Sequence, residues 1–148
     1  MAKPNIIIAE NGDQVALELI KIVKSCLEKV EEGGNHKAVI GVSGGSLPKF
    51  LVQGIHSDLG KDIDWSKVTF IFCDERMVDI SHPDSTMGLY KNLLAESPIK
   101  YSDQFLEVAV NLDVESAAVD YEDKLKSLMG KEDQPPRIDL LLLGTVLL

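Results

Sequence analysis

Two short apolar runs, each followed at once by small or charged residues, constrain the fold of this chain more than any other feature. The run 38–42 leads into Ser-Gly-Gly-Ser at 43–46, and the run 68–72 leads into Cys-Asp-Glu-Arg at 73–76. An unbroken apolar run of roughly 4–8 residues is typical of a strand buried on both faces of a parallel sheet. In open sheets of this kind, ligands bind outside the carboxyl ends of the strands. The sequence therefore predicts an α/β fold with polar groups gathered at one sheet edge.

Apolar residues recur at steps of three and four in other segments, which is typical of amphipathic helices. The sequence predicts helices that contain the stripes 15–30, 47–55, 87–94 and 114–128, with Gly130 ending the last helix. We expect the last stripe, which is the most regular, to lie in the core. The first stripe consists of Val15, Leu19, Ile22, Cys26 and Val30, and the last of Val114, Ala118, Tyr121, Leu125 and Leu128.

Further strands are predicted at 6–9, 105–110 and 138–144. The segment 138–144 shows no polar alternation, so we expect it to be covered on both faces. The order of strands and helices predicts a mostly parallel, Rossmann-like sheet flanked by helices. At 148 residues, the chain 1–148 is expected to form a single α/β domain.

The charge balance excludes some classes of function. The net charge is −9 at pH 7, whereas general binders of nucleic acid or anionic membranes need stripes of Lys and Arg. We therefore expect no nucleic-acid or membrane partner, although a few cations and backbone amides would suffice for one small anion. Cys26 and Cys73 lack zinc-site spacing, and we expect both to be reduced and buried, with no metal site. The N-terminus lacks the apolar core of a signal peptide, so the expected location is cytoplasmic.

The Ser-Gly-Gly-Ser sequence lies where a strand passes into a helix. Glycines let the backbone turn sharply and approach a ligand closely. The helix N-terminus offers amides and the positive end of its dipole to an anion. The alternative is a tight turn without a ligand, in which the last serine caps the helix. The residues expected to bind a phosphate are Ser43, Gly44, Gly45 and Ser46.

The Cys-Asp-Glu-Arg sequence places two carboxylates and a guanidinium at the same sheet edge. Arg76 can hold a phosphate or carboxylate through two parallel hydrogen bonds. Asp74 or Glu75 could transfer a proton or hold the arginine in place. The alternative is a solvated acidic turn. His82 follows in the same loop, and no role is assigned to it because a lone loop histidine is more often structural.

Together these motifs resemble those of the 6-phosphogluconolactonases of the eukaryotic cytosolic type. The resemblance rests on Gly-Val-Ser-Gly-Gly-Ser at 41–46, Phe-Cys-Asp-Glu-Arg at 72–76 and His-Pro-Asp-Ser-Thr-Met-Gly-Leu-Tyr at 82–90, and it extends to about Gly144. The wider superfamily includes glucosamine-6-phosphate deaminases and isomerases. Those typically have Asp-Glu-Tyr where this chain has Asp-Glu-Arg, which favours the lactonase.

The resemblance implies hydrolysis of 6-phosphoglucono-δ-lactone to 6-phosphogluconate, the second step of the oxidative pentose phosphate pathway. It also implies that no metal or organic cofactor takes part. From the matching motifs, Gly44, Gly45 and Ser46 would bind the substrate around its phosphate. Arg76 would contact the charged oxygens of the substrate, and Asp74 would line the site and orient its neighbours.

The end of the chain departs from the family pattern. In the family, the strand matching 140–144 leads into a Gly-Pro-Asp-Gly-His-Thr loop, whose histidine would be the general base. Here Gly144 is followed by Thr-Val-Leu-Leu. We expect a fold incomplete relative to the family, a divergent tail at 145–148 and weak or absent lactonase activity. An exposed apolar edge at 138–144, open to aggregation or a partner, is also expected.

Two alternatives remain open at this point. One is a sugar-phosphate isomerase or deaminase, which turnover of glucosamine-6-phosphate would reveal. The other is a non-catalytic fragment that binds a sugar phosphate. For that alternative, 6-phosphogluconate would stabilise the chain without any turnover.

Overall fold

Four parallel strands form one sheet in the order β3-β2-β1-β4 in the computed structural model of the chain. The structure describes residues 3–34, 37–129 and 137–144. β1 and β2 pair along their whole length, from Ala38 opposite Val68 to Val42 opposite Phe72. All carboxyl ends therefore lie at one edge of the sheet, which confirms the predicted parallel α/β architecture. The strands are β1 (Ala38–Val42), β2 (Val68–Phe72), β3 (Phe105–Leu106) and β4 (Leu140–Leu142).

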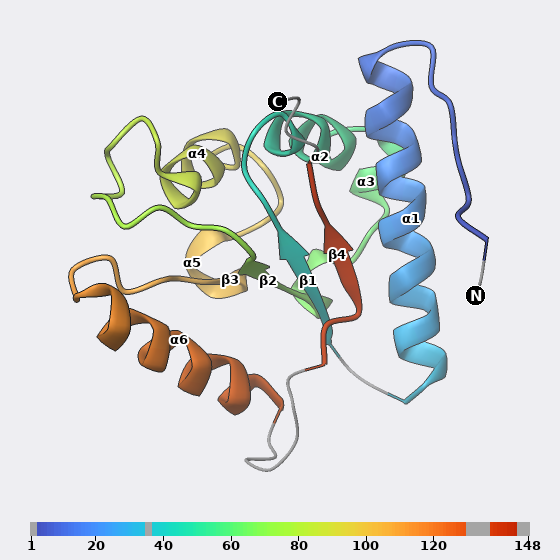
Figure 1. Cartoon of the computed structure of the whole chain (residues 1–148). Helices are drawn as coiled ribbons and strands as arrows, with labels where there is room; N and C mark the ends of the chain where they lie inside the picture. The colour runs from blue at the N-terminus through green and yellow to red at the C-terminus, as the bar shows by residue number, and fades with distance from the viewer. Residues whose placement is uncertain (1–2, 35–36, 130–136, 145–148) are drawn as a thin grey trace.

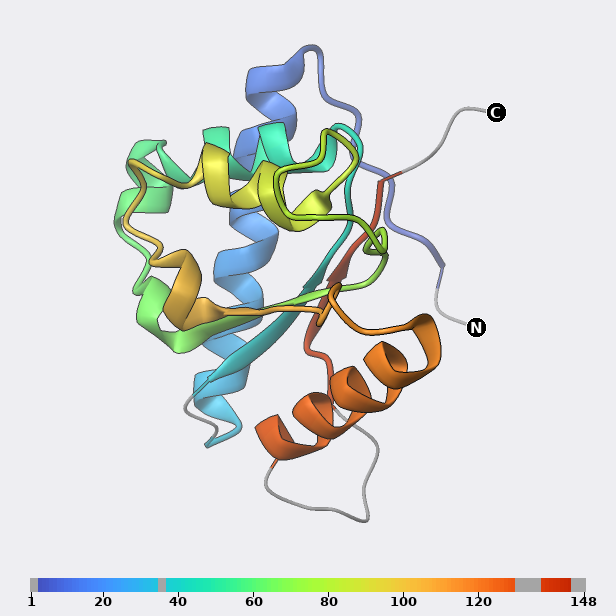
Figure 2. The same ribbon diagram turned by 90° about the vertical axis from the view of Figure 1, so that its left-hand side faces the viewer.

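Helices cover both faces of the sheet. The chain moves in one direction from β1 to β2 to β3 and then crosses back past β1 to β4. Because crossovers between parallel strands are right-handed, this return places α6 on the face opposite α1, α2 and α4, as Figures 1 and 2 show. The helices are α1 (Gly12–Glu32), α2 (Leu47–Ile55), α3 (Asp58–Lys61), α4 (Thr86–Leu93), α5 (Tyr101–Gln104) and α6 (Val114–Met129), with a 3-10 turn at Trp65–Lys67.

Aromatic side chains fill the core between β2, β3 and α4. The ring of Phe105 lies 4.6 Å from that of Phe70 and 5.5 Å from that of Tyr90, measured between centroids. Phe70 and Tyr90 are fully buried. Such ring pairs stabilise a core beyond the area that they bury. The start of α4 is therefore firmly placed against the carboxyl half of the sheet.

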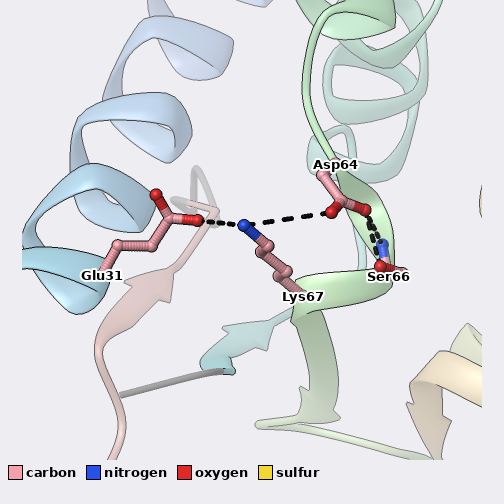
Figure 3. A network of polar contacts seen from close by, with 4 residues as sticks. All are labelled: Glu31, Asp64, Ser66 and Lys67. Atoms are coloured by element: carbon pink, nitrogen blue, oxygen red, sulfur yellow. Dashed lines mark hydrogen bonds and ion pairs between the residues drawn. The ribbon is translucent and has the colours of Figure 1, made fainter. Parts of the chain in front are cut away.

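A network of ion pairs lies at the amino-terminal edge of the sheet, opposite the edge where the strands end. Lys67 lies just before β2 and pairs with Glu31 at the end of α1 and, at 4.0 Å, with Asp64 (Figure 3). Asp64 also accepts a hydrogen bond of 2.6 Å from the Ser66 hydroxyl. All of these side chains are largely in solvent, so the network fixes the local geometry more than it stabilises the fold.

The predicted strand at 6–9 is wrong. The structure has no strand there, and Ile6 and Ile8 are 78% and 90% exposed. The segment contributes no strand to the described sheet. An apolar run becomes a strand only when a partner accepts its backbone hydrogen bonds, and no described strand does so here.

The last predicted strand is shorter and less covered than expected. β4 forms the edge of the sheet beside β1, and only its Leu142 is buried. Leu141 and Leu143 are 51% and 64% exposed, so the expectation of cover on both faces is wrong. The physical reason is position, because β4 is an edge strand and no described strand pairs with its outer side. The third predicted strand is likewise shorter, since β3 ends at Leu106.

The stripe predicted for the first helix coincides only in part with its buried face, because Val30 of that stripe is buried but its first half is rotated. α1 buries Ala16, Ile20 and Val23, whereas Val15 and Ile22 of the predicted stripe are exposed. Its sequence is apolar on several sides, so spacing alone did not determine the buried face.

α6 forms where predicted but does not place its whole stripe in the core. Val114, Ala118 and Leu128 are exposed, while Tyr121 and Leu125 are half-buried. α6 lies apart from the other long helices (Figure 2), so its flanks face solvent. The predicted helix stop at Gly130 and the predicted tail at 145–148 lie outside the described residues. No helix among the described residues is both long and apolar enough to cross a membrane.

Candidate functional site

The Ser-Gly-Gly-Ser sequence forms the turn between β1 and α2. Gly45 has φ +71°, in the left-handed region that favours glycine. The buried Ser43 accepts a hydrogen bond from Tyr90 Oη on its carbonyl at 3.1 Å and one from the Gly144 amide on Oγ at 3.0 Å. The turn is thus held both to α4 and to Gly144, the second residue after the end of β4.

Ser46 stands at the N-cap position of α2 but does not cap it. Its side chain makes no capping hydrogen bond, and Pro48 occupies the first turn. The alternative prediction, a turn in which Ser46 caps the helix, is therefore wrong in its detail. The helix N-terminus is positive through its dipole. No described side chain caps the first amides of α2.

Asp74 joins the second motif to the first. Its Oδ1 accepts a hydrogen bond of 3.3 Å from the Gly44 amide, across the ends of β1 and β2. A Cβ on Gly44 would lie 3.0 Å from Thr86 Oγ1, so the turn also packs closely against the start of α4. The two predicted motifs are therefore neighbours in space, as expected for strand ends at one sheet edge.

Arg76 is available to an anion in this arrangement. It lines the same pocket as Asp74. Within the described ranges, no acidic side chain forms an ion pair with its guanidinium. Its neighbour Glu75 points its carboxylate at the amides of Thr86 and Met87 instead, at 3.0 and 2.5 Å. The predicted solvated acidic turn thus does not describe Glu75, which is half-buried.

The start of α4 is fully capped, unlike that of α2. Glu75 accepts from the first two amides of the helix, and Ser85 Oγ accepts from the Gly88 amide at 3.0 Å. These bonds satisfy the donors that a helix start leaves open. Of these two helix starts, only that of α2 lacks a side-chain cap among the described residues.

Together these residues enclose a pocket of about 300 Å³ at the carboxyl edge of the sheet. Larger hollows of about 480 and 750 Å³ lie elsewhere, and residues of the two motifs line neither. Three residues of the two motifs do not line the 300 Å³ pocket: Ser46, Cys73 and Glu75. Its lining consists of Ser43, Gly44, Gly45, Asp74, Arg76, Pro83, Asp84, Ser85, Thr86, Leu89 and Gly144.

The sequence reasoning missed the part that α4 plays here. Tyr90 is fully buried, and burial together with nearby Asp74 raises the pKa of its hydroxyl, which stays protonated and donates to Ser43. Ser85 and Thr86 line the pocket. The only sequence pattern that pointed to Ser85 and Thr86 was a serine before an apolar stripe, and this pattern predicts the start of a helix but not a ligand site.

Other titratable residues give the site little further chemistry. His82 lies in the exposed loop after β2, where its Nδ1 accepts from the Asp84 amide at 3.1 Å, and it does not line the pocket. Both cysteines are free, but Cys73 is exposed and Cys26 half-buried, so the expectation that both are buried is wrong. Partial burial, followed by Asp74, raises the pKa of the Cys73 thiol. Among the described residues, no group of three His, Cys, Asp or Glu could hold a metal ion.

A family model agrees with this geometry. The model described as glucosamine-6-phosphate isomerases/6-phosphogluconolactonase matches residues 10–145. The chain belongs to this family. Both motifs, the pocket and α4 fall inside the matched range.

Curated relatives carry the lactonase name of this family. A 6-phosphogluconolactonase of Rattus norvegicus is 37% identical over 138 residues, which are 91% of this chain and 51% of the relative. One of Homo sapiens is 32% identical over 94% of this chain and 54% of the relative. The chain thus spans about half the length of the curated relatives that it matches.

Solved structures of family members share the fold. A 6-phosphogluconolactonase from Leishmania guyanensis superposes with a TM-score of 0.75 at 21% identity, over 95% of this chain and 59% of that one. One from Thermotoga maritima gives a TM-score of 0.67 at 20% identity, over 82% and 53% of the two chains. The predicted resemblance and fold class are confirmed.

Proposed function

We propose that this chain carries the sugar-phosphate site of a 6-phosphogluconolactonase. That enzyme hydrolyses 6-phosphoglucono-δ-lactone to 6-phosphogluconate in the pentose phosphate pathway. The observation that carries the proposal is the meeting of the two motifs in one pocket, where Asp74 accepts a hydrogen bond from the Gly44 amide and Arg76 forms no ion pair with any described residue. The names of the relatives support it. A cytoplasmic location belongs to the same proposal.

The phosphate of the substrate would lie between the glycine turn and Arg76. The backbone of Gly44 and Gly45 forms the pocket wall, and α2 begins just beyond it. Ser46, which neither caps the helix nor lines the pocket, would add its hydroxyl as a donor at the helix start beyond this wall. Arg76 would contribute charge-assisted hydrogen bonds, which are about twice as strong as neutral ones. Asp74 would hold the turn in position through Gly44.

Hydrolysis of a lactone requires more than this grip. Water attacks the ester carbonyl, so the reaction needs a base for the water and donors for the developing oxyanion. The described pocket lining contains the carboxylates Asp74 and Asp84 but no histidine. A missing general base typically lowers the rate by ~10²–10⁴-fold. We therefore expect weak turnover by this chain, with ligand binding retained.

A second candidate function follows from the same absence of a histidine in the described lining. The chain would bind a sugar phosphate without converting it. An isomerase or deaminase remains a third alternative, because the family includes isomerases. The relatives named here are lactonases, and Arg76 stands where isomerases typically have a tyrosine.

The rate of 6-phosphogluconolactone hydrolysis by the purified chain, set against the spontaneous rate in the same buffer, tests the proposal. We expect a rate slightly above background, and saturable binding of 6-phosphogluconate. Arg76→Ala should weaken that binding by ~10–100-fold, since it removes charge-assisted hydrogen bonds worth about 1.5–3 kcal/mol.

Other outcomes would select among the alternatives. Turnover of glucosamine-6-phosphate would contradict the lactonase assignment. Binding with no turnover at all would support the non-catalytic reading. Binding that Arg76→Ala leaves unchanged would place the sugar phosphate elsewhere and contradict the proposed site.

A further inference from the structure

Glu75 lies between the two proposed site residues of its motif, but its carboxylate has a different set of contacts. Oε1 accepts from the Thr86 amide at 3.0 Å and from the Arg76 amide at 2.7 Å. Oε2 accepts from the Met87 amide at 2.5 Å. Both oxygens of this half-buried carboxylate therefore bind backbone donors.

These contacts leave Glu75 badly placed for proton transfer. A general base or acid needs an oxygen within hydrogen-bond reach of the reacting group. Glu75 does not line the pocket, although Asp74 and Arg76 on either side of it do. Its charge instead lies at the positive N-terminus of α4, where a carboxylate is stabilising.

We propose that Glu75 is a positioning residue, which clamps the start of α4 to the end of β2 and so holds Arg76 over the pocket. This inference rests on the proposed sugar-phosphate site. It decides between the two roles that the sequence left open for the acids of this motif, and it excludes proton transfer by Glu75.

The clamp acts on the backbone of Arg76 from two sides. The Arg76 amide donates to Glu75, and the Arg76 carbonyl accepts from the Val78 amide at 2.8 Å. With both backbone groups held, the direction in which the Arg76 side chain leaves the loop is set. A planar guanidinium that must form two parallel bonds to an anion is sensitive to such a change of direction.

The same clamp stabilises a second part of the pocket wall, formed by the start of α4 and the glycine turn. α4 carries Thr86, which packs against Gly44, and Tyr90, which donates to the Ser43 carbonyl. Glu75 is the residue through which the loop after β2 bonds to the first amides of this helix. Shape and charge of the pocket therefore depend on one carboxylate that does not face it.

A double-mutant cycle measured by NMR titration with 6-phosphogluconate tests the proposal. Glu75→Gln keeps the shape of the side chain but replaces one acceptor oxygen by a donor that faces the Met87 amide. We expect it to raise Kd by about 10-fold, the loss of a hydrogen bond to a charged group. In the Arg76→Ala background, the same change should raise Kd by less than about 2-fold, because coupled residues are not additive.

Asp113→Asn provides the matched control. Asp113 is also a carboxylate that accepts from an amide at a helix start, here that of Ser116 at 2.9 Å, but it lies at α6 and outside the pocket. We expect no change in Kd for this variant. An equal loss of affinity from Glu75→Gln in both arginine backgrounds would overturn the proposal, because it would show a general effect on folding. An unchanged Kd in Glu75→Gln, with only hydrolysis lowered, would also overturn it and would identify Glu75 as a proton-transfer residue.

Amide exchange without ligand separates this inference from the proposed function. In Glu75→Gln, we expect the amides of Arg76, Thr86 and Met87 to exchange at least about 10-fold faster, while those of α6 do not change. If the unaltered chain binds no 6-phosphogluconate, the proposed function fails. The rates of amide exchange then test by themselves whether Glu75 holds the start of α4. Unchanged exchange at these amides would then overturn the inference.

Discussion

Gly45 determines the direction of the turn between β1 and α2 at the scale of one residue. Its φ of +71° lies in the left-handed region, and a Cβ at this position would meet no atom of the described residues within 4 Å. The cost of a side chain here is therefore backbone strain alone, about 1–2 kcal/mol.

Gly34 offers a control that is matched in conformation. It has φ +78° and open space around it, at the end of α1 and away from the pocket. We predict that Gly45→Ala and Gly34→Ala both lower the free energy of unfolding by about 1–2 kcal/mol in urea titrations. Only Gly45→Ala should also weaken binding of 6-phosphogluconate. Equal effects of the two variants on binding would contradict a ligand role for the turn.

Tyr90 and Tyr101 form a second pair for comparison. Tyr90 Oη donates to the Ser43 carbonyl at 3.1 Å, whereas Tyr101 Oη is buried without a hydrogen-bond partner among the described residues. Tyr90→Phe should lower the free energy of unfolding by about 1–2 kcal/mol, because the Ser43 carbonyl loses its donor in a buried place. Tyr101→Phe should be neutral or stabilising, since it removes an unsatisfied polar group. Denaturant titration of both variants checks this, and the reverse order would contradict it.

At the scale of the element, the sequence patterns predicted whether a segment is a helix or a strand better than they predicted how that segment is paired and buried. The runs 38–42 and 68–72 became β1 and β2 with their predicted bounds, because each pairs with the other and is buried. The equally apolar 6–9 has no partner strand and stays irregular. The local pattern of apolar residues shows which side chains a segment can bury. Whether the segment finds a partner strand and is packed over depends on elements that are distant in the sequence.

The site shows the same division. The positions of Gly44, Asp74 and Arg76 at strand ends followed from the order of elements, so their meeting could be predicted. Two hydrogen bonds could not be predicted, because both depend on how α4 packs onto the sheet. The Thr86 amide donates one to Glu75, and Tyr90 donates the other to Ser43. Side-chain direction across such a packed interface has no periodic signal in the sequence.

The edge strand β4 carries a prediction of its own. Leu143, just after the end of β4, is 64% exposed at the sheet edge. The unpaired backbone groups of an edge strand can form hydrogen bonds with a strand of another chain. We predict self-association of the chain, measured by sedimentation velocity, and a clear reduction of it in Leu143→Lys. Val119→Lys is the matched control, because Val119 is 59% exposed but lies on α6. An equal reduction by both changes would indicate nonspecific attraction and not edge pairing.

At the scale of the whole molecule, the acidic surface sets the dependence of stability on pH. Hydrogen bonds from neighbouring serines lower the pKa of Asp64, Asp79 and Asp113. Since the folded state holds these carboxylates ionised, their contribution is present above the unfolded pKa of about 3.9 and is lost as pH falls below it.

We therefore predict a urea midpoint that changes little between about pH 5 and pH 8 and falls below about pH 4. The triple variant with asparagine at these three positions should show a shallower fall in acid. A steep loss of stability between about pH 7 and pH 6 would contradict this account, because it would point to a histidine.

The chain spans about half the length of the curated relatives that it matches, so its proposed site needs a direct test. The measurement that most directly tests the central claim is an NMR titration of the chain with 6-phosphogluconate, with gluconate as the matched ligand that lacks the phosphate. We predict saturable shifts of the Gly44, Gly45 and Arg76 amides, and affinity for gluconate weaker by at least about 10-fold. Equal affinity for both ligands, or shifts confined to the groove lined by Lys91, Lys100 and Lys124, would contradict a sugar-phosphate site at the two motifs.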